Sequence, residues 1–105
     1  MTRPANPARG EAGLTVGGAA ILLRPSFAAL VAAEAELGPL FALVERAAEG
    51  RLTLAEMAAL FFHCAKDRPE GCTRELIGQA IAEQGLANAT PALKTLLTQI
   101  LQGRV

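Results

Sequence analysis

The chain has one histidine, His63, which stands beside Cys64, with Asp67 one helical turn further on and Cys72 in the segment after it. Such side chains bind zinc or, as a Cys–His pair, form a nucleophile. On a helix, however, Cys64 would point about 100° away from the face that His63 and Asp67 share. The spacing therefore favours a surface histidine and a small buried thiol, and we expect no metal ion and no cofactor.

A second candidate for chemistry is Glu34, which falls among the apolar residues of a predicted helix. A carboxylate placed there needs a donor or access to water, because an unpaired buried charge is very costly. Arg24, a backbone N–H of the preceding segment, or Arg46 could supply the donor. The alternative is that Glu34 recognises a backbone or an arginine of a partner. No second carboxylate is placed for acid–base work, so we predict no catalytic residue and no enzyme.

The elements that position these residues begin with a predicted hairpin over residues 11–24. Gly17-Gly18 supplies the positive φ angles of a two-residue turn. Pairing across this turn puts apolar residues on one face, with Glu11, Thr15 and Arg24 on the other, where Leu22 is the apolar exception. The predicted apolar pairs are Val16 with Ala19, Leu14 with Ile21, and Ala12 with Leu23.

Capping residues then predict five short helices. Ser26 begins a helix to about Leu37, Pro39 opens one that closes at Gly50, and the capping box Thr53–Glu56 introduces one that ends near Asp67. Thr73 begins a fourth helix to Gly85, and Thr90-Pro91 a fifth. The predicted inward residues are, in chain order, Phe27, Leu30, Val31, Glu34, Leu37; Leu40, Phe41, Val44, Ala47; Leu54, Met57, Leu60, Phe61, Cys64; Leu76, Ile77, Ala80, Ile81; Leu93, Leu96, Leu97, Ile100, Leu101.

Length and composition set the architecture. The 105 residues are 51% hydrophobic, mostly Ala and Leu, with four Phe and no Trp or Tyr. We predict a mainly α (α+β) fold: an N-terminal two-stranded antiparallel hairpin packed on a compact bundle of about five short helices. Residues 1–10, rich in Pro and Arg, read as a disordered lead, and 11–105 as a single domain.

Charge and cysteine content exclude several classes of function. Ten basic residues balance ten acidic ones without a basic stripe, which disfavours nucleic-acid binding. If the third and fourth predicted helices formed a helix-turn-helix, the fourth would present the acidic Glu75 and Glu83 to DNA, which disfavours that interpretation. No signal peptide or membrane span is visible, and two cysteines are too few for a disulfide scaffold. We therefore expect a cytoplasmic protein.

The sequence offers a partner mainly apolar surface. Leu22 on the outer hairpin face and Phe62 beside Phe61 exceed what one small core needs, and the last helix is rich in leucine. The predicted partner-binding residues are Leu22, Arg24, Glu34 and Phe62. The open edges of the hairpin are a second possible docking element, through strand addition.

Several segments resemble the small tail protein of gene transfer agents, which are phage-like particles encoded by alphaproteobacteria. The resemblance is carried by residues 6–11, residues 23–30 (Leu-Arg-Pro-Ser-Phe-Ala-Ala-Leu), residues 34–38 (Glu-Ala-Glu-Leu-Gly) and residues 49–56. That family is called tail tube protein, while its wider grouping is with phage tail assembly chaperones. A tube subunit is built around a β-barrel or sandwich, whereas a chaperone is small and helical, so the predicted elements favour the chaperone.

The resemblance implies a protein of phage-like tail morphogenesis, with the tail tape-measure protein and the tail tube subunits as partners and a possible homo-oligomer. An assembly chaperone would keep the apolar segments of the tape-measure protein soluble. The alternative is a structural tail component retained in the particle, and the weaker alternative is a small metal-binding protein centred on His63.

Overall fold

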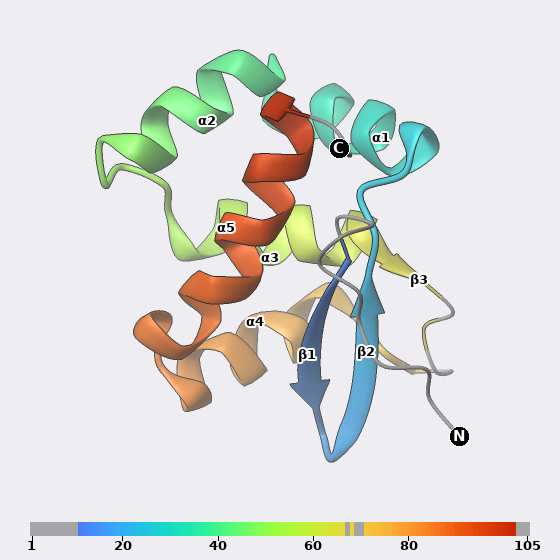
Figure 1. Ribbon diagram of the computed structural model, residues 1–105. Helices are drawn as coiled ribbons and strands as arrows, with labels where there is room; N and C mark the ends of the chain where they lie inside the picture. Colours follow the sequence, from blue (N-terminus) through green and yellow to red (C-terminus); the bar gives the residue numbers. More distant parts are fainter. Residues whose placement is uncertain (1–10, 67, 69–70, 103–105) are drawn as a thin grey trace.

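A computed structural model describes residues 11–66, 68 and 71–102 of the chain (Figure 1). It has the predicted architecture, a hairpin followed by helices, with a short third strand added. The predicted N-terminal lead lies outside the described residues. The elements, in chain order, are β1 (Ala12–Val16), β2 (Ala19–Leu23), α1 (Phe27–Leu37), α2 (Leu40–Ala48), α3 (Leu54–Cys64), β3 (Ala65–Lys66), α4 (Arg74–Gln84) and α5 (Leu86–Gln102).

The hairpin has the predicted register. Gly17 and Gly18 adopt φ angles of 56° and 83° at the turn, where a side chain would be strained. All three predicted apolar pairs are formed, from Val16 with Ala19 to Ala12 with Leu23. Strand β3 was not predicted from the sequence pattern. Its two residues pair antiparallel with Leu22 and Leu23 and complete the sheet order β1-β2-β3.

The predicted caps of three helices are present. Ser26 and Thr73 accept hydrogen bonds from backbone N–H groups of the first turns of α1 and α4, and Thr53 forms the full capping box with Glu56. Two boundaries differ from the prediction. The third helix ends at Cys64 rather than near Asp67, because the chain turns there into β3.

The last helix begins four residues earlier than predicted. It starts at Leu86, so that Pro91 lies in its second turn. A proline so near the start removes one helical hydrogen bond, and the first turn gains other contacts. The side chains of Asn88 and Thr90 donate to the carbonyl oxygens of Gln84 and Leu86, and Ala89 is buried. Packing of this turn therefore overrides the local proline signal.

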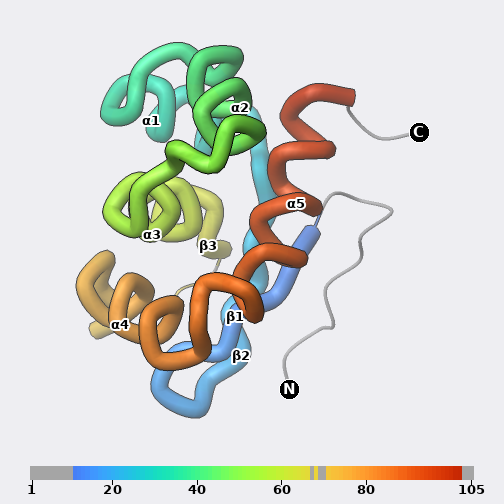
Figure 2. Tube along the Cα trace, turned by 90° about the vertical axis from the view of Figure 1, so that its left-hand side faces the viewer, coloured from blue at the N-terminus to red at the C-terminus, as the bar shows by residue number. Residues whose placement is uncertain are grey.

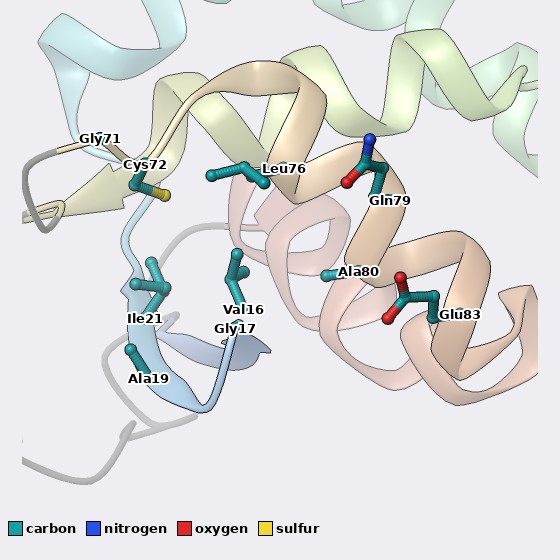
Figure 3. Close-up of a pocket in the computed structure, with 10 residues that line it drawn as sticks. All are labelled: Val16, Gly17, Ala19, Ile21, Gly71, Cys72, Leu76, Gln79, Ala80 and Glu83. Atoms are coloured by element: carbon teal, nitrogen blue, oxygen red, sulfur yellow. The ribbon is translucent and has the colours of Figure 1, made fainter.

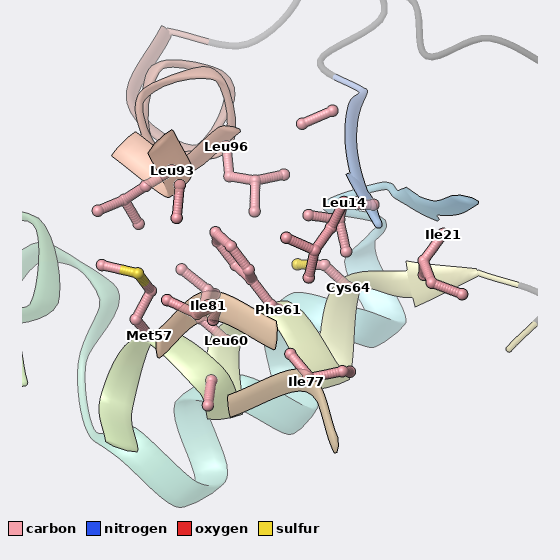
Figure 4. Packing of buried hydrophobic residues seen from close by; sticks show 14 of the residues in the cluster. Leu14, Ile21, Met57, Leu60, Phe61, Cys64, Ile77, Ile81, Leu93 and Leu96 are labelled. Atoms are coloured by element: carbon pink, nitrogen blue, oxygen red, sulfur yellow. The ribbon is translucent and has the colours of Figure 1, made fainter. Parts of the chain in front are cut away.

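The core lies where the hairpin, α3, α4 and α5 meet. The Phe61 side chain is fully buried and points from α3 into the space between α5 and the hairpin (Figure 4). Leu14 of β1, Ile81 of α4 and Leu96 of α5 surround it. Helices α1 to α4 form a stack, and α5 and the hairpin run along one side of that stack (Figure 2).

The predicted inward faces of the first two helices are only partly correct. Leu30, Leu37 and Leu40 pack against the core, but the phenylalanines do not. The buried residues of α1 are Ala29 and Ala33, while Phe27 is 85% exposed and Val31 is exposed too. On α2 the buried residue is Leu43, and Phe41 is 77% exposed. Helix α1 packs mainly on α3 through its alanines, which allow a closer approach of the two helices than larger side chains would. This close packing turns the phenylalanine outward.

The later helices bury most of the predicted residues. Leu54, Leu76 and Leu101 are the exceptions, since each of these leucines is exposed at the surface. Within the outer hairpin face, Glu11 and Arg24 form an ion pair instead of facing water separately. Glu11 is fully buried and accepts from the Arg24 Nε at 2.9 Å. The outer face of the sheet is therefore partly covered near the start of β1.

Candidate protein-binding surfaces

The first candidate is a set of exposed apolar side chains on α1 and α2, which we call the aromatic arm: Phe27 and Val31 of α1 and Phe41 of α2. Phe27 and Val31 are one helical turn apart, so they share one face of α1. The described part of the chain has four aromatic rings of Phe, and the arm carries two of them. Exposed large apolar side chains in a set of this kind are typical of a protein-binding surface.

Short-range contacts hold the arm in place. The chain turns sharply at Gly38 and Pro39, where α1 and α2 meet at 75°. The Glu34 side chain accepts a hydrogen bond of 3.1 Å from the backbone N–H of Leu40 and so satisfies the first turn of α2. Arg46 of α2 pairs with Glu56 of α3 at 2.5 Å. The Glu34 cap thus joins α1 to α2, while the Arg46–Glu56 ion pair connects α2 to α3 and Leu43 of α2 is buried in the core.

The second candidate surface is a groove between the hairpin tip and α4, which we call the hairpin groove (Figure 3). Its volume is about 320 Å³. It is lined by Val16, Gly17, Ala19, Ile21, Gly71, Cys72, Leu76, Gln79, Ala80 and Glu83. Most of these residues are apolar or small, and the groove opens to the surface beside Leu76, which is 42% exposed.

The four predicted partner-binding residues do not form one site. Leu22 is half-buried in β2 beside Lys66 of β3, and the Arg24 side chain is held by Glu11. The Glu34 carboxylate accepts from the backbone N–H of Leu40 at the start of α2, so neither of the two predicted arginines, Arg24 and Arg46, is its donor. Glu34 is exposed, so its predicted place on the inward face of α1 is wrong. Among the described residues, no hydrogen bond or ring contact joins any two of the four.

Phe62 lies at a polar junction of three helices. The guanidinium groups of Arg68 and Arg74 lie 4.0 and 5.2 Å from the centre of its ring. Beside it, Glu36 of α1 contacts His63 of α3 at 2.9 Å and also pairs with Arg74 of α4. The His63 hydrogen bond, followed by that of Arg74, lowers the pKa of the Glu36 carboxyl below its ordinary value. This cluster connects α1, α3 and α4.

The cysteines and the histidine are separated in the structure. Cys64 is buried in the core, where loss of hydration raises the pKa of its thiol to about 12. Cys72 is partly exposed and lines the hairpin groove, while His63 binds Glu36. Asp67 lies outside the described residues. Within residues 11–66, 68 and 71–102, no three side chains of His, Cys, Asp or Glu come together to hold a metal ion.

The free edge of the hairpin is also partly occupied. The side-chain amide of Gln84 in α4 donates a hydrogen bond of 2.6 Å to the carbonyl oxygen of Thr15 in β1. Helices α4 and α5 both pack against this strand. Strand addition at β1, one of the docking modes suggested by the sequence, would have to displace this contact.

Comparison with protein families identifies the chain. The family model described as "Phage tail tube protein, GTA-gp10" matches residues 9–103, which is nearly the whole length. The chain belongs to this family. It is therefore a protein related to the tail of phages and gene transfer agents, and the family implies association with other tail proteins. Comparisons with curated proteins and with solved structures gave no match.

For this phage tail family member, the aromatic arm is the surface that sequence reasoning missed. The sequence predicted Phe27 and Phe41 as core residues. One signal was available: α1 is apolar on nearly every side from Phe27 to Ala33, so its pattern cannot specify which side is buried. In the described part of the chain, no single helix is long and apolar enough to cross a bilayer, and α1 and α2 meet that criterion only when joined as the bent pair.

Proposed function

We propose that this protein is a non-catalytic tail assembly chaperone that binds the tape-measure protein through the aromatic arm. The observation that carries the proposal is the exposure of Phe27 and Phe41, 85% and 77%, in a chain with few aromatic residues. Membership of a phage tail family supplies the setting in which such a surface meets a partner.

The physics of the arm supports transient binding. Fully burying a phenylalanine contributes about 1.5–3 kcal/mol, so two of them contribute roughly 3–6 kcal/mol before the costs of association. Those costs are about 4–15 kcal/mol, so one arm would bind weakly by itself. Several copies bound along one long partner would act together, as expected for a protein that covers apolar segments and is later released.

The arrangement of the arm also suits a helical partner. Phe27 and Val31 form a short apolar strip along α1, and Phe41 is a second exposed ring, on α2. An amphipathic helix of the tape-measure protein could lay its apolar face against such a surface. Tail tube subunits are the second class of partner in this proposal.

Co-expression with the tape-measure protein of the same tail tests the proposal. We expect the partner to be soluble and to co-purify with the wild-type chain. The double variant Phe27→Ser/Phe41→Ser should lose most of the complex, because both rings leave the interface. The matched control is Leu86→Ser/Leu101→Ser, which removes two exposed leucines of α5 away from the arm. A tape-measure protein that stays equally insoluble with and without the chain would refute the proposal.

A structural tail component is the second candidate, and the description of the family as a tail tube protein favours it. Mass spectrometry of purified particles separates the two. Presence at a fixed ratio to the other tail proteins supports the structural component, whereas a complex in cell extracts together with absence from particles supports the chaperone.

A further inference from the structure

We infer that the hairpin groove binds an apolar side chain of the partner that is followed or preceded, three or four residues away, by a lysine or arginine. The inference rests on the proposed chaperone function and assigns one occupant to the groove, a segment of the tape-measure protein. The groove lies on α4 and the hairpin, so it is a contact separate from the aromatic arm on α1 and α2.

The shape of the groove comes from small residues. Four of its ten lining residues are Gly or Ala, namely Gly17, Ala19, Gly71 and Ala80. Val16 and Ile21 of the inner hairpin face lie opposite Leu76 of α4 (Figure 3). Because the small residues add little bulk between these walls, about 320 Å³ is left open. A site with apolar walls of this kind suits an apolar anchor.

The walls of the groove are held in position before a partner arrives. The turn at Gly17-Gly18 fixes the end of the hairpin, and the Gln84 amide ties Thr15 of the hairpin to the end of α4. Thr73 caps the start of α4 on the other side of the groove. A preformed groove lowers the entropy cost of binding, because little of the protein has to be ordered at that moment.

The charge of Glu83 indicates which type of side chain the partner should carry close to the apolar side chain that enters the groove. Glu83 lies on the side of α4 that faces the groove (Figure 3), and within the described residues it makes no hydrogen bond or ion pair. The nearest basic residue of the same helix, Arg74, is already paired with Glu36. Among the described residues that line the groove, Glu83 therefore presents an unpaired negative charge beside an apolar floor, which complements a cationic side chain.

Spacing along α4 sets the position of that cationic residue. Ala80 lines the floor and Glu83 the rim, three residues apart, which is about 4.5 Å along a helix. A helical partner lying along α4 would reach both with residues three or four positions apart. The recognised pattern is thus an apolar residue with Lys or Arg one turn away.

Binding measurements on the wild-type chain and four variants test the inference. With the purified tape-measure protein as the probe, we expect Glu83→Lys and Leu76→Gln each to weaken binding about tenfold. The matched controls are Glu75→Lys on the same helix and Leu86→Gln at an exposed site on α5, and both should stay within about twofold. Thermal unfolding of each variant shows whether it is folded.

The outcomes separate the two proposals. If the wild-type chain binds the tape-measure protein and the groove variants bind as the controls do, the groove inference is wrong and the chaperone proposal stands. If the wild-type chain does not bind it, both are wrong. If Glu83→Lys and Leu76→Gln alone lose affinity, the inference holds.

Alkylation of Cys72 gives an independent readout. This thiol lines the groove and is partly exposed, whereas Cys64 is buried with its pKa raised to about 12, so iodoacetamide should modify Cys72 selectively. We expect the bound tape-measure protein to slow alkylation of Cys72 at least about fivefold. The control protein Cys72→Ser/Lys94→Cys carries its thiol on α5 and should show no such protection. Equal rates for free and bound Cys72 would overturn the inference.

Discussion

Two regions of this protein place phenylalanine in opposite environments. In the body, made of the hairpin, α3, α4 and α5, Phe61 is fully buried between elements that come from distant parts of the sequence. In the aromatic arm, Phe27 and Phe41 face solvent on helices that bury mainly alanines and Leu43. The body therefore accounts for most of the apolar burial, and the arm keeps its large side chains available to a partner.

Side-chain size governs which face of these helices is buried. Ala29 and Ala33 let α1 lie close to α3, and the Cβ of Ala58 is 3.5 Å from where a side chain on Gly78 of α4 would begin. Close helix approach is compatible with small residues at the contact. The large phenylalanine side chains therefore lie either in the core, as Phe61 does, or at the surface, as Phe27 does.

The largest expected effect contrasts Phe61→Ala with Phe41→Ala. Removing the buried Phe61 ring leaves a cavity among β1, α4 and α5 and should lower the free energy of unfolding by about 3–5 kcal/mol. Phe41→Ala should change it by less than about 0.5 kcal/mol, because that ring is mostly exposed. Urea unfolding followed by circular dichroism measures both. Equal losses would show that the arm is part of the core.

The next contrast concerns two ion pairs. Arg24→Met removes the guanidinium group that pairs with the fully buried Glu11 carboxylate and should cost about 2–3 kcal/mol. Arg51→Met breaks the pair with Glu49, in which the Arg51 side chain is 70% exposed and the Glu49 side chain 58%. This substitution should change the free energy of unfolding by about 0–0.5 kcal/mol. Thermal and urea unfolding of the two variants at pH 7 compare them. A loss for Arg51→Met as large as that for Arg24→Met would contradict the distinction between body and surface.

A smaller effect is expected where the arm joins the body. The Thr53 side chain accepts a hydrogen bond from the backbone N–H of Glu56, and the Glu56 carboxylate accepts one from the N–H of Thr53. Thr53→Ala should cost about 1 kcal/mol, because it removes the side-chain half of the capping box of α3. Thr98→Ala, an exposed threonine of α5, is the control. Hydrogen exchange should show the loss first in the opening turn of α3.

The smallest expected effect is a dependence on pH at the junction of α1, α3 and α4. The pKa of Glu36 is lowered by the hydrogen bonds from His63 and Arg74, so its ionised form stabilises the fold above the ordinary value of 4.5. That stabilisation is lost as the pH falls through the lowered pKa. Glu36→Gln should therefore be less stable than wild type at pH 7, and the difference should shrink towards pH 3. Glu45→Gln on α2 is the control, and parallel curves for Glu36→Gln and wild type would exclude the linkage.

The local structure could be predicted from the amino-acid sequence. The diglycine turn specified the hairpin and its register because only one pairing puts all the apolar residues on one face. Ser26, Thr53 and Thr73 specified three helix starts because each hydroxyl satisfies a backbone N–H within the same turn. Family membership was also accessible, since the matching segments are contiguous in the chain.

The exposed surfaces depend on how the helices and strands pack against one another. Helix α1 is apolar on most sides, so its pattern allowed Phe27 inside or outside, and the close packing of alanines on α3 placed it outside. The third strand and the hairpin groove arise from segments that are far apart in sequence and meet in space. Local signals act over a few residues, whereas burial depends on every element that competes for the same core, and for that reason the binding surfaces could not be predicted from the sequence pattern.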